Sequence, residues 1–258
     1  MKKIVLICML TMLGLTQGFA QSESGSKVES FGIFDHFGGG VSLGVDGIGF
    51  DVAAPITDYV AVRMGLSFLP KITYGFDMDI DSNSSSFTSK KVKAEGKLNK
   101  VDFKLLFDAY PFKNSSFHVT LGAFIGSSKV VSVYNTEPFL NPAEWGTAGV
   151  KIGDYRICSD ENGNVNADIK VNTFKPYLGV GFGRAVPKGR IGFSFDLGVQ
   201  FWGTPGVYAL AKDDFGNTSY QKLKKGDVKN DDADKFFDIM SKIVVYPVLS
   251  FRLSGRFL

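Results

Sequence analysis

The sequence is poor in the residues that build most catalytic and metal sites. Its 258 residues include only 2 His and 2 Cys. Cys8 lies within the first twenty residues, so a chain processed there keeps Cys158 alone and forms no internal disulfide. The sequence also has no Walker, Rossmann or zinc-binding motif. We therefore expect no enzymatic activity, no cofactor and no bound metal.

The sequence has neither a block nor a large excess of positive charge. It contains 29 Lys and Arg against 26 Asp and Glu, a formal net charge of +3. Removal of a leader that carries Lys2 and Lys3 leaves 27 against 26, or +1. Proteins that bind nucleic acid concentrate basic residues on one face or along one helix. We expect no nucleic-acid partner.

Beyond residue 20 the sequence has no apolar run of the ~20 residues that a membrane-spanning helix needs. The first twenty residues have the pattern of a secretory signal peptide instead. Lys2 and Lys3 precede an apolar stretch at 4–15, and Gly18-Phe19-Ala20 puts small residues at the cleavage positions. We expect cleavage after Ala20, a short N-terminal segment at 21–35, and one folded domain at 36–258.

Alternation of apolar and polar residues dominates this domain, and a period of two is the strand period. At the C-terminus, Leu249, Phe251 and Leu253 alternate with polar residues. Such segments are about ten residues or longer, as a tilted strand needs to cross a bilayer. Their polar faces hold small and charged residues, which suit a narrow lumen. The pattern predicts an all-β, antiparallel, up-and-down transmembrane β-barrel with strands at 36–45, 48–55, 59–74, 97–110, 116–134, 166–186, 189–202 and 244–258.

The connections between these strands are of two lengths. Tight turns lie at 55–58, 111–116 and 187–190, whereas the segments 75–96, 135–165 and 203–243 are long and polar. Outer-membrane barrels have short periplasmic turns and long extracellular loops. The hairpin signal Asp46-Gly47 brings the expected number of strands to eight. Ten strands result if Val150–Arg156 or Gly206–Leu210 also crosses the membrane.

The last long connection contains an expected helix. Phe236, Ile239, Met240 and Ile243 fall at helical spacing, and Asp231 or Asp232 can cap its N-terminus. We expect a short amphipathic helix at 231–243 that packs on its own barrel. A place on the lipid surface and a role in binding a partner are the alternatives.

The chain resembles the eight-stranded outer-membrane β-barrels of Gram-negative bacteria, of the OmpA/OmpW-like type. The resemblance rests on the C-terminal strand 248–257, on Pro176–Gly183, on Gly192–Val199 and on the opening Gly47–Phe50. It implies a location in the cell outer membrane, contact with outer-membrane lipid and insertion by the barrel-assembly machinery. Phe251, Leu253 and Phe257 match the alternating C-terminal assembly signal, although Leu258 replaces the usual final aromatic residue. We expect a monomer.

The predicted lumen contains as many acidic as basic residues. Charges in a confined space are costly unless they are paired. We therefore expect a lumen filled by ion pairs, so that any activity as a structural or surface-interaction protein belongs to the extracellular loops. A narrow, porin-like path for ions or small solutes is the alternative. The predicted lumen charge network is Asp51, Arg63, Asp102, Lys104, Asp108, Asp196, Arg252 and Arg256.

Two further groups of residues suggest chemistry only weakly. His118 and Thr120 share one strand face, as in a hydrolase, but both point to the lumen, where a lipid chain has poor access. A lipid-modifying enzyme is therefore the third hypothesis. Asp77, Asp79, Asp81 and Asn83 have the spacing of a calcium loop but lack its glycine and its final glutamate. We expect a solvated strand edge there.

Overall fold

In the computed structural model the chain divides into two compact units, residues 1–30 and 31–258. The structure describes residues 36–79, 91–112, 114–137, 149–152, 155–159, 162–212, 218–223, 242 and 244–257. The predicted signal peptide and N-terminal segment lie outside these residues, as do Asp81, Asn83 and all of the predicted helix except Lys242. Among the described residues, no helix reaches the length and hydropathy that a membrane span requires.

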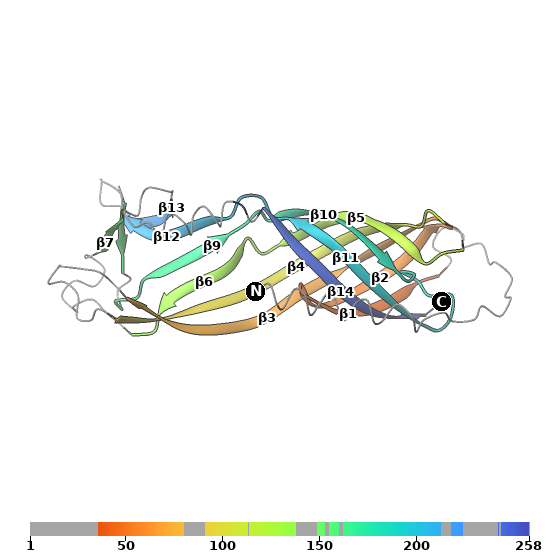
Figure 1. The fold of residues 1–258 in the computed structure, drawn as a ribbon, viewed down its shortest axis with the longest axis horizontal. Coiled ribbons are helices and arrows are strands. Elements are labelled where there is room, and N and C mark those ends of the chain that lie inside the picture. Colours follow the sequence, from red (N-terminus) through yellow and green to blue (C-terminus); the bar gives the residue numbers. More distant parts are fainter. Residues whose placement is uncertain are drawn as a thin grey trace. The chain divides into compact units, whose positions relative to one another are not determined.

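Eight antiparallel strands pair in chain order. The ring closes because β1 pairs with β14, and because β3 also pairs with β4. Closure gives each of these strands a hydrogen-bonded neighbour on both sides, which removes the open edges of the ring. The predicted eight-stranded, up-and-down barrel is confirmed (Figure 1). The ring consists of β1 (Gly38–Gly44), β2 (Gly47–Thr57), β3 (Val60–Asp79), β4 (Lys91–Ala109), β5 (Phe117–Gly126), β10 (Phe174–Phe182), β11 (Ile191–Phe201) and β14 (Val245–Arg256).

The same sheet continues beyond the ring as an extension that begins where β6 pairs with β4. Its described strands are β6 (Lys129–Asn135), β7 (Gly149–Ile152), β8 (Tyr155–Cys158), β9 (Asn166–Lys170), β12 (Gly206–Lys212) and β13 (Thr218–Leu223). The segments 135–165 and 203–243, which we expected to be long polar connections with a helix at 231–243, thus contain strands among their described residues. The described residues of Val150–Arg156 belong to β7 and β8, and Gly206–Leu210 belongs to β12, so neither segment adds a strand to the ring.

Several strand boundaries also differ from the prediction. β3 and β4 remain paired as far as Asp79 and Lys91, so the described part of the segment 75–96 is strand. Two strands expected to be continuous are interrupted, at 127–128 between β5 and β6 and at 171–173 between β9 and β10. At 127–128 the chain leaves the ring and enters the extension, and at 171–173 it returns from the extension to the ring, so the pairing partners change at both breaks.

The hairpin between β1 and β2 depends on glycine. Gly44 pairs with Gly47, so the turn residues are Val45 and Asp46, one position earlier than predicted. Gly47 has a φ of +101°, in the region that disfavours residues with a side chain. A Cβ at this position would lie 2.2 Å from the carbonyl oxygen of Phe68. The tight turn therefore requires glycine here.

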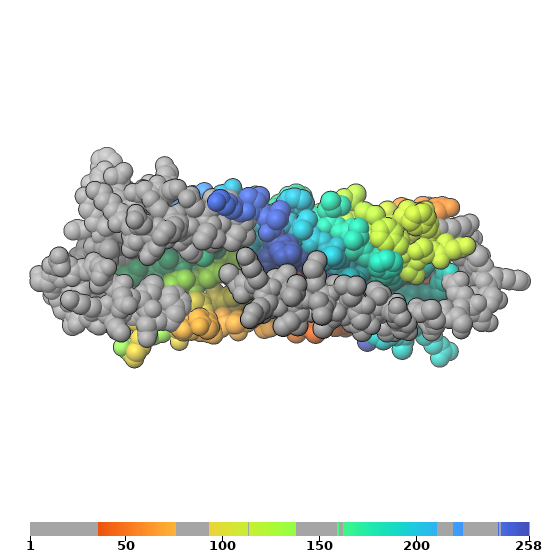
Figure 2. Space-filling model, in the orientation of Figure 1, coloured from red at the N-terminus to blue at the C-terminus, as the bar shows by residue number. Residues whose placement is uncertain are grey.

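Within the ring, the outer face is apolar and the inner face is polar. On β11, Phe193 and Leu197 are exposed, whereas Ser194, Asp196 and Gln200 are buried. The apolar exterior continues onto the neighbouring strands β14 and β10. Figure 2 shows the surface of β14 in blue among its neighbours. The eleven residues of β11, at about 3.4 Å per residue and a tilt of about 45°, reach roughly 25 Å along the barrel axis. This is the height of the apolar band of a membrane barrel.

In the extension this polarity is reversed along the same strands. The exterior of β4 changes from Val101 and Phe103 in the ring to Glu95 and Lys97 above it. Its interior changes from buried charges to the apolar side chains of Ala94 and Leu98. A sheet in water has an apolar inner face and a polar outer face. The ring thus has the polarity of a membrane barrel, and the extension that of a sheet in water.

Candidate functional site: a closed, charged lumen

Arg63 is the centre of the group of lumen charges that lies nearest the β2–β3 and β4–β5 turns. Its guanidinium Nε lies 2.7 Å from Asp108 Oδ2, and its Nη2 lies 2.9 Å from Asp196 Oδ1. Thr120 donates a hydrogen bond of 2.7 Å to Asp108, and His118 Nε2 lies 2.9 Å from Asp196. These five side chains come from β3, β4, β5 and β11, and all are buried. We call them the lower cluster.

His118 is held as a cation by its neighbours. Its Nε2 faces the carboxylate of Asp196, and its Nδ1 lies 3.0 Å from the carbonyl oxygen of Gly183. Asp196 also accepts hydrogen bonds from Arg63 on both oxygens, which identifies it as ionised. Carbonyl and carboxylate oxygens only accept, so both ring nitrogens must donate. The ring has no lone pair left to take a proton from Thr120.

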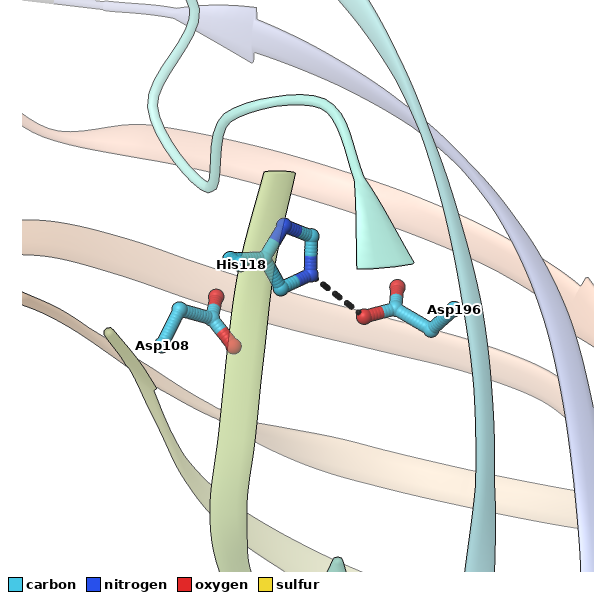
Figure 3. Close-up of side chains that lie close together, drawn as sticks. All are labelled: Asp108, His118 and Asp196. Carbon is cyan, nitrogen blue, oxygen red and sulfur yellow. Dashed lines mark hydrogen bonds and ion pairs between the residues drawn. The ribbon is translucent and has the colours of Figure 1, made fainter. Parts of the chain in front are cut away.

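Asp108, His118 and Asp196 also lie close enough together to be considered as metal ligands (Figure 3). The cation that these carboxylates already share is Arg63, and a metal ion would have to displace it. The hydrogen bonds of His118 leave neither nitrogen free to coordinate. The geometry fits an internal ion-pair network better than a metal site.

A second cluster joins β14 to β2 and β4. Arg252 donates through Nε and Nη2 to Asp51, at 2.9 and 2.6 Å. Lys104 Nζ lies 3.4 Å from the same carboxylate and donates to the hydroxyl of Ser42 at 3.2 Å. Arg252 Nη1 donates to the carbonyl oxygen of Ala185, which fixes the β10–β11 turn to the lumen wall.

The third cluster contains two lysines that are absent from the predicted network. Asp102 lies 2.7 Å from Lys175 Nζ and 3.2 Å from Lys100 Nζ. Both lysines are completely or almost completely buried, and Lys100 also donates to Gln200. Lys100 has the same strand parity as Asp102, and Lys175 the same parity as Tyr177. Counting the alternation back by two residues, from Asp102 on β4 and from Tyr177 on β10, would have predicted both lysines in the lumen.

The lumen is closed at both ends by side chains. At the turn end, Ala185 and Val186 pack with Ala53, Ala61 and Tyr110. The backbone N–H of Ala185 donates to the Tyr110 hydroxyl at 2.8 Å. A pocket beside this plug has a volume of about 20 Å³, which is room for about one water molecule.

At the extension end, Trp202 and Tyr246 stack with ring centroids 4.3 Å apart. They belong to an apolar layer that includes the buried side chains of Val130 and Val171. Lys100 Nζ lies 5.1 Å from the Tyr246 ring centroid, so the aromatic layer lies next to the third charged cluster, which contains Lys100. Two apolar layers and three charged clusters of the described side chains thus lie inside the ring.

Asp46 lies in the β1–β2 turn at this end and is buried. Burial raises the pKa of its carboxyl above the ordinary value, although the Lys104 and Lys100 ammonium groups act in the opposite direction. The predicted lumen network lacks Asp46, because a hairpin turn is expected to be exposed to water.

The remaining predicted residues occupy other positions. Arg256 is half-buried at the end of β14 and takes part in none of the ion pairs that the described residues form. Phe251, Leu253 and Phe257 are exposed on the outer face. Phe257 donates its backbone N–H to Phe37 at 2.9 Å. Cys158 ends β8 in the extension.

Comparison with known proteins gives structural likenesses only. No family model and no curated protein matches the chain. Acinetobacter baumannii CarO2 is 19% identical with a TM-score of 0.49, covering 89% of this chain and 100% of its own. Acinetobacter baumannii CarO is 14% identical with a TM-score of 0.45, covering 84% and 96%. A major outer membrane protein from Thermus thermophilus is 17% identical with a TM-score of 0.41, covering 86% and 98%. All three fall below 25% identity and a TM-score of 0.5, so function must be inferred from this chain's own residues.

Proposed function

We propose that the protein is an integral outer-membrane β-barrel that does not conduct, and that it acts through the sheet extension outside the membrane. The observation that carries this proposal is the reversal of polarity between ring and extension. An apolar exterior around a closed ring is stable in lipid, where every backbone polar group must be satisfied internally. The polar exterior of the extension is stable in water.

The orientation follows from the lengths of the connections. The β2–β3, β4–β5 and β10–β11 turns lie at one end of the ring, and the extension grows from the other. Short turns face the periplasm in outer-membrane barrels. The extension then faces the outside of the cell, where it can meet other molecules.

The closed lumen supports a structural or surface-interaction role over transport. Two apolar layers and three ion-paired clusters occupy it, and each acid of the described clusters has a cationic partner. A conducting path would need water in place of the Trp202–Tyr246 layer and of the Ala185–Val186 plug. We expect no steady conductance.

The test has two stages. The refolded protein should migrate differently on a gel before and after boiling, as a closed barrel does, and should partition into outer membranes that need detergent for extraction. In a planar lipid bilayer it should be silent, and Trp202→Ala combined with Tyr246→Ala should remain silent while the lower plug is intact. Discrete, reproducible conductance steps from the unmodified protein would overturn the non-conducting role and favour a narrow porin-like channel.

Insertion is expected to follow the usual route for such barrels. Phe251 and Leu253 on the last strand, with Phe257 directly after it, form an apolar row that the barrel-assembly machinery can recognise. We expect the barrel to be a monomer in lipid, because ring closure leaves no edge within the membrane. The finer likeness to OmpA/OmpW-type barrels stays a prediction. A lipid-modifying activity of His118 and Thr120 has no support in the hydrogen bonds of His118.

A further inference from the structure

Lysines gather on the outer face of the extension, directly above the apolar band. Lys129 and Lys170 are opposite each other on β6 and β9. Below them on the same two chain segments, Ile125 and Phe174 are opposite each other on β5 and β10 and are exposed. An apolar pair is thus followed by a basic pair along two adjacent segments.

The distance between the two pairs matches the depth of a lipid headgroup. Lys129 follows Ile125 by four positions, and Phe174 follows Lys170 by four. Even a fully extended chain, at about 3.3 Å per position and a tilt of about 45°, would place the two pairs at most roughly 9 Å apart along the membrane normal. Acyl chains against Ile125 and Phe174 would place their headgroup beside the lysines.

The basic pair has more positive charge than its neighbours neutralise. Like charges directly opposite each other across two strands repel. Asp168, two residues from Lys170 on β9, pairs with Lys129, with its oxygen 3.2 Å from Nζ, while it also accepts from the hydroxyl of Ser132. Among the described residues, the contacts of Lys170 are with aromatic faces, 4.7 Å from the Tyr208 centroid and 5.3 Å from that of Tyr220. Within the part of the chain that the structure describes, the two ammonium groups thus have one neighbouring carboxylate, which pairs with Lys129 alone.

We propose that Lys129 and Lys170 bind the phosphate of an anionic lipid whose acyl chains lie on the apolar band. The inference rests on the proposed function, since it needs the ring to be in a membrane. A soluble anion would satisfy the lysines but not the apolar pair, and an uncharged lipid would satisfy only the apolar pair. Tyrosine and lysine side chains at this height are typical of a membrane–water interface.

The test measures binding of single lipids to the refolded barrel in detergent by native mass spectrometry. The probes are lipid A, phosphatidylglycerol and phosphatidylcholine, with inorganic phosphate as competitor. The variant K129Q/K170Q should bind both phosphate-bearing anionic lipids at least about tenfold more weakly, from the usual contribution of a lysine near an anionic surface. The control K188Q/R190Q removes the same charge from the exposed β10–β11 turn at the opposite end and should leave this binding unchanged.

Asp168→Asn gives the opposite expectation. It keeps an oxygen to accept from Ser132 but releases Lys129 from its carboxylate, so the anionic lipids should bind more tightly. This increase separates a phosphate site from a general loss of structure in the lysine variant.

Equal binding by the unmodified protein and K129Q/K170Q would overturn the inference. Equal weakening by the control would overturn it too, as would full displacement of the lipid by millimolar inorganic phosphate, which would indicate a soluble anion. The gel-mobility test separates the two proposals. A protein that never inserts refutes the membrane role and this site together, whereas an inserted barrel with no preference for anionic lipid refutes the site alone.

Discussion

Arg63 offers the sharpest test of the filled lumen. It pairs with two buried carboxylates on different strands, Asp108 and Asp196, and its own side chain is almost fully buried. The substitution Arg63→Met keeps most of the volume and removes the charge. Both carboxylates then lose their strongest partner in a space that water barely enters.

The expected loss of stability is about 3–5 kcal/mol, the usual cost of leaving a buried charge without its partner. The two carboxylates should not contribute equally. Asp196 keeps the protonated ring of His118 at 2.9 Å, whereas Asp108 keeps only the hydroxyl of Thr120. Adding Asp108→Asn to Arg63→Met should therefore restore more stability than adding Asp196→Asn.

The assay is reversible urea unfolding in one detergent or lipid, read by gel mobility and fluorescence for the four proteins. The unfolding free energy should fall for Arg63→Met and recover most in the variant that also carries Asp108→Asn. A loss below about 1 kcal/mol, typical of a solvated ion pair, would refute the picture of a dry, ion-paired lumen. Equal recovery by the two carboxamides would contradict the assignment of His118 as a cation.

Three other predictions test the membrane boundary, the first hairpin and the buried turn carboxylate. Leu66→Arg, in the exposed apolar band of β3, should lower the unfolding free energy in lipid by about 2–4 kcal/mol. Asn99→Arg, just above the band, should lower it much less in the same unfolding assay, and similar losses would refute the boundary. Gly47→Ala should destabilise the protein by roughly 1–3 kcal/mol, because of the positive φ and the nearby Phe68 carbonyl. Gly75→Ala, whose Cβ would meet nothing within 4 Å, should be close to neutral, and equal unfolding midpoints of the two variants would contradict this prediction. Burial raises the pKa of Asp46 above 3.8 in the folded state, so its contribution to stability should fall as pH rises through that raised pKa. Asp46→Asn should therefore flatten the dependence of the unfolding free energy on pH. Parallel pH curves for the unmodified protein and Asp46→Asn would contradict this prediction.

The sequence by itself determined which ring residues share a face of the sheet. A period of two assigns alternate residues to opposite faces of a strand. The alternation, combined with the small and charged residues of one face, places Asp51, Arg63, Asp102 and Asp196 in the lumen, and all four are buried there. The number of strands in the ring followed from the same pattern combined with turn signals.

Side-chain pairing inside the lumen depended on the tertiary structure. The alternation could have predicted that Lys100 and Lys175 face the lumen. It could not predict that both pair with Asp102, because Lys100 is on β4 and Lys175 on β10, two strands separated by β5 in the ring. Distances across a barrel depend on strand stagger, which local alternation does not encode. The same limit applies to the pairing of Arg252 with Asp51, 201 residues apart.

The extension was the feature that only the tertiary structure revealed. Its strands are short and polar on one side, so in the sequence they resemble loops, and each gains stability only by pairing with β4 or with another extension strand. Alternation determines that neighbouring residues face opposite ways, but it does not determine which face is outward. On β4 the same alternation continues from the ring into the extension, while the surroundings of the strand change from lipid to water. Sequence alone therefore determined the alternation and the ring. The three-dimensional pairing of the strands decided where the lipid-facing surface ends and the water-facing surface begins.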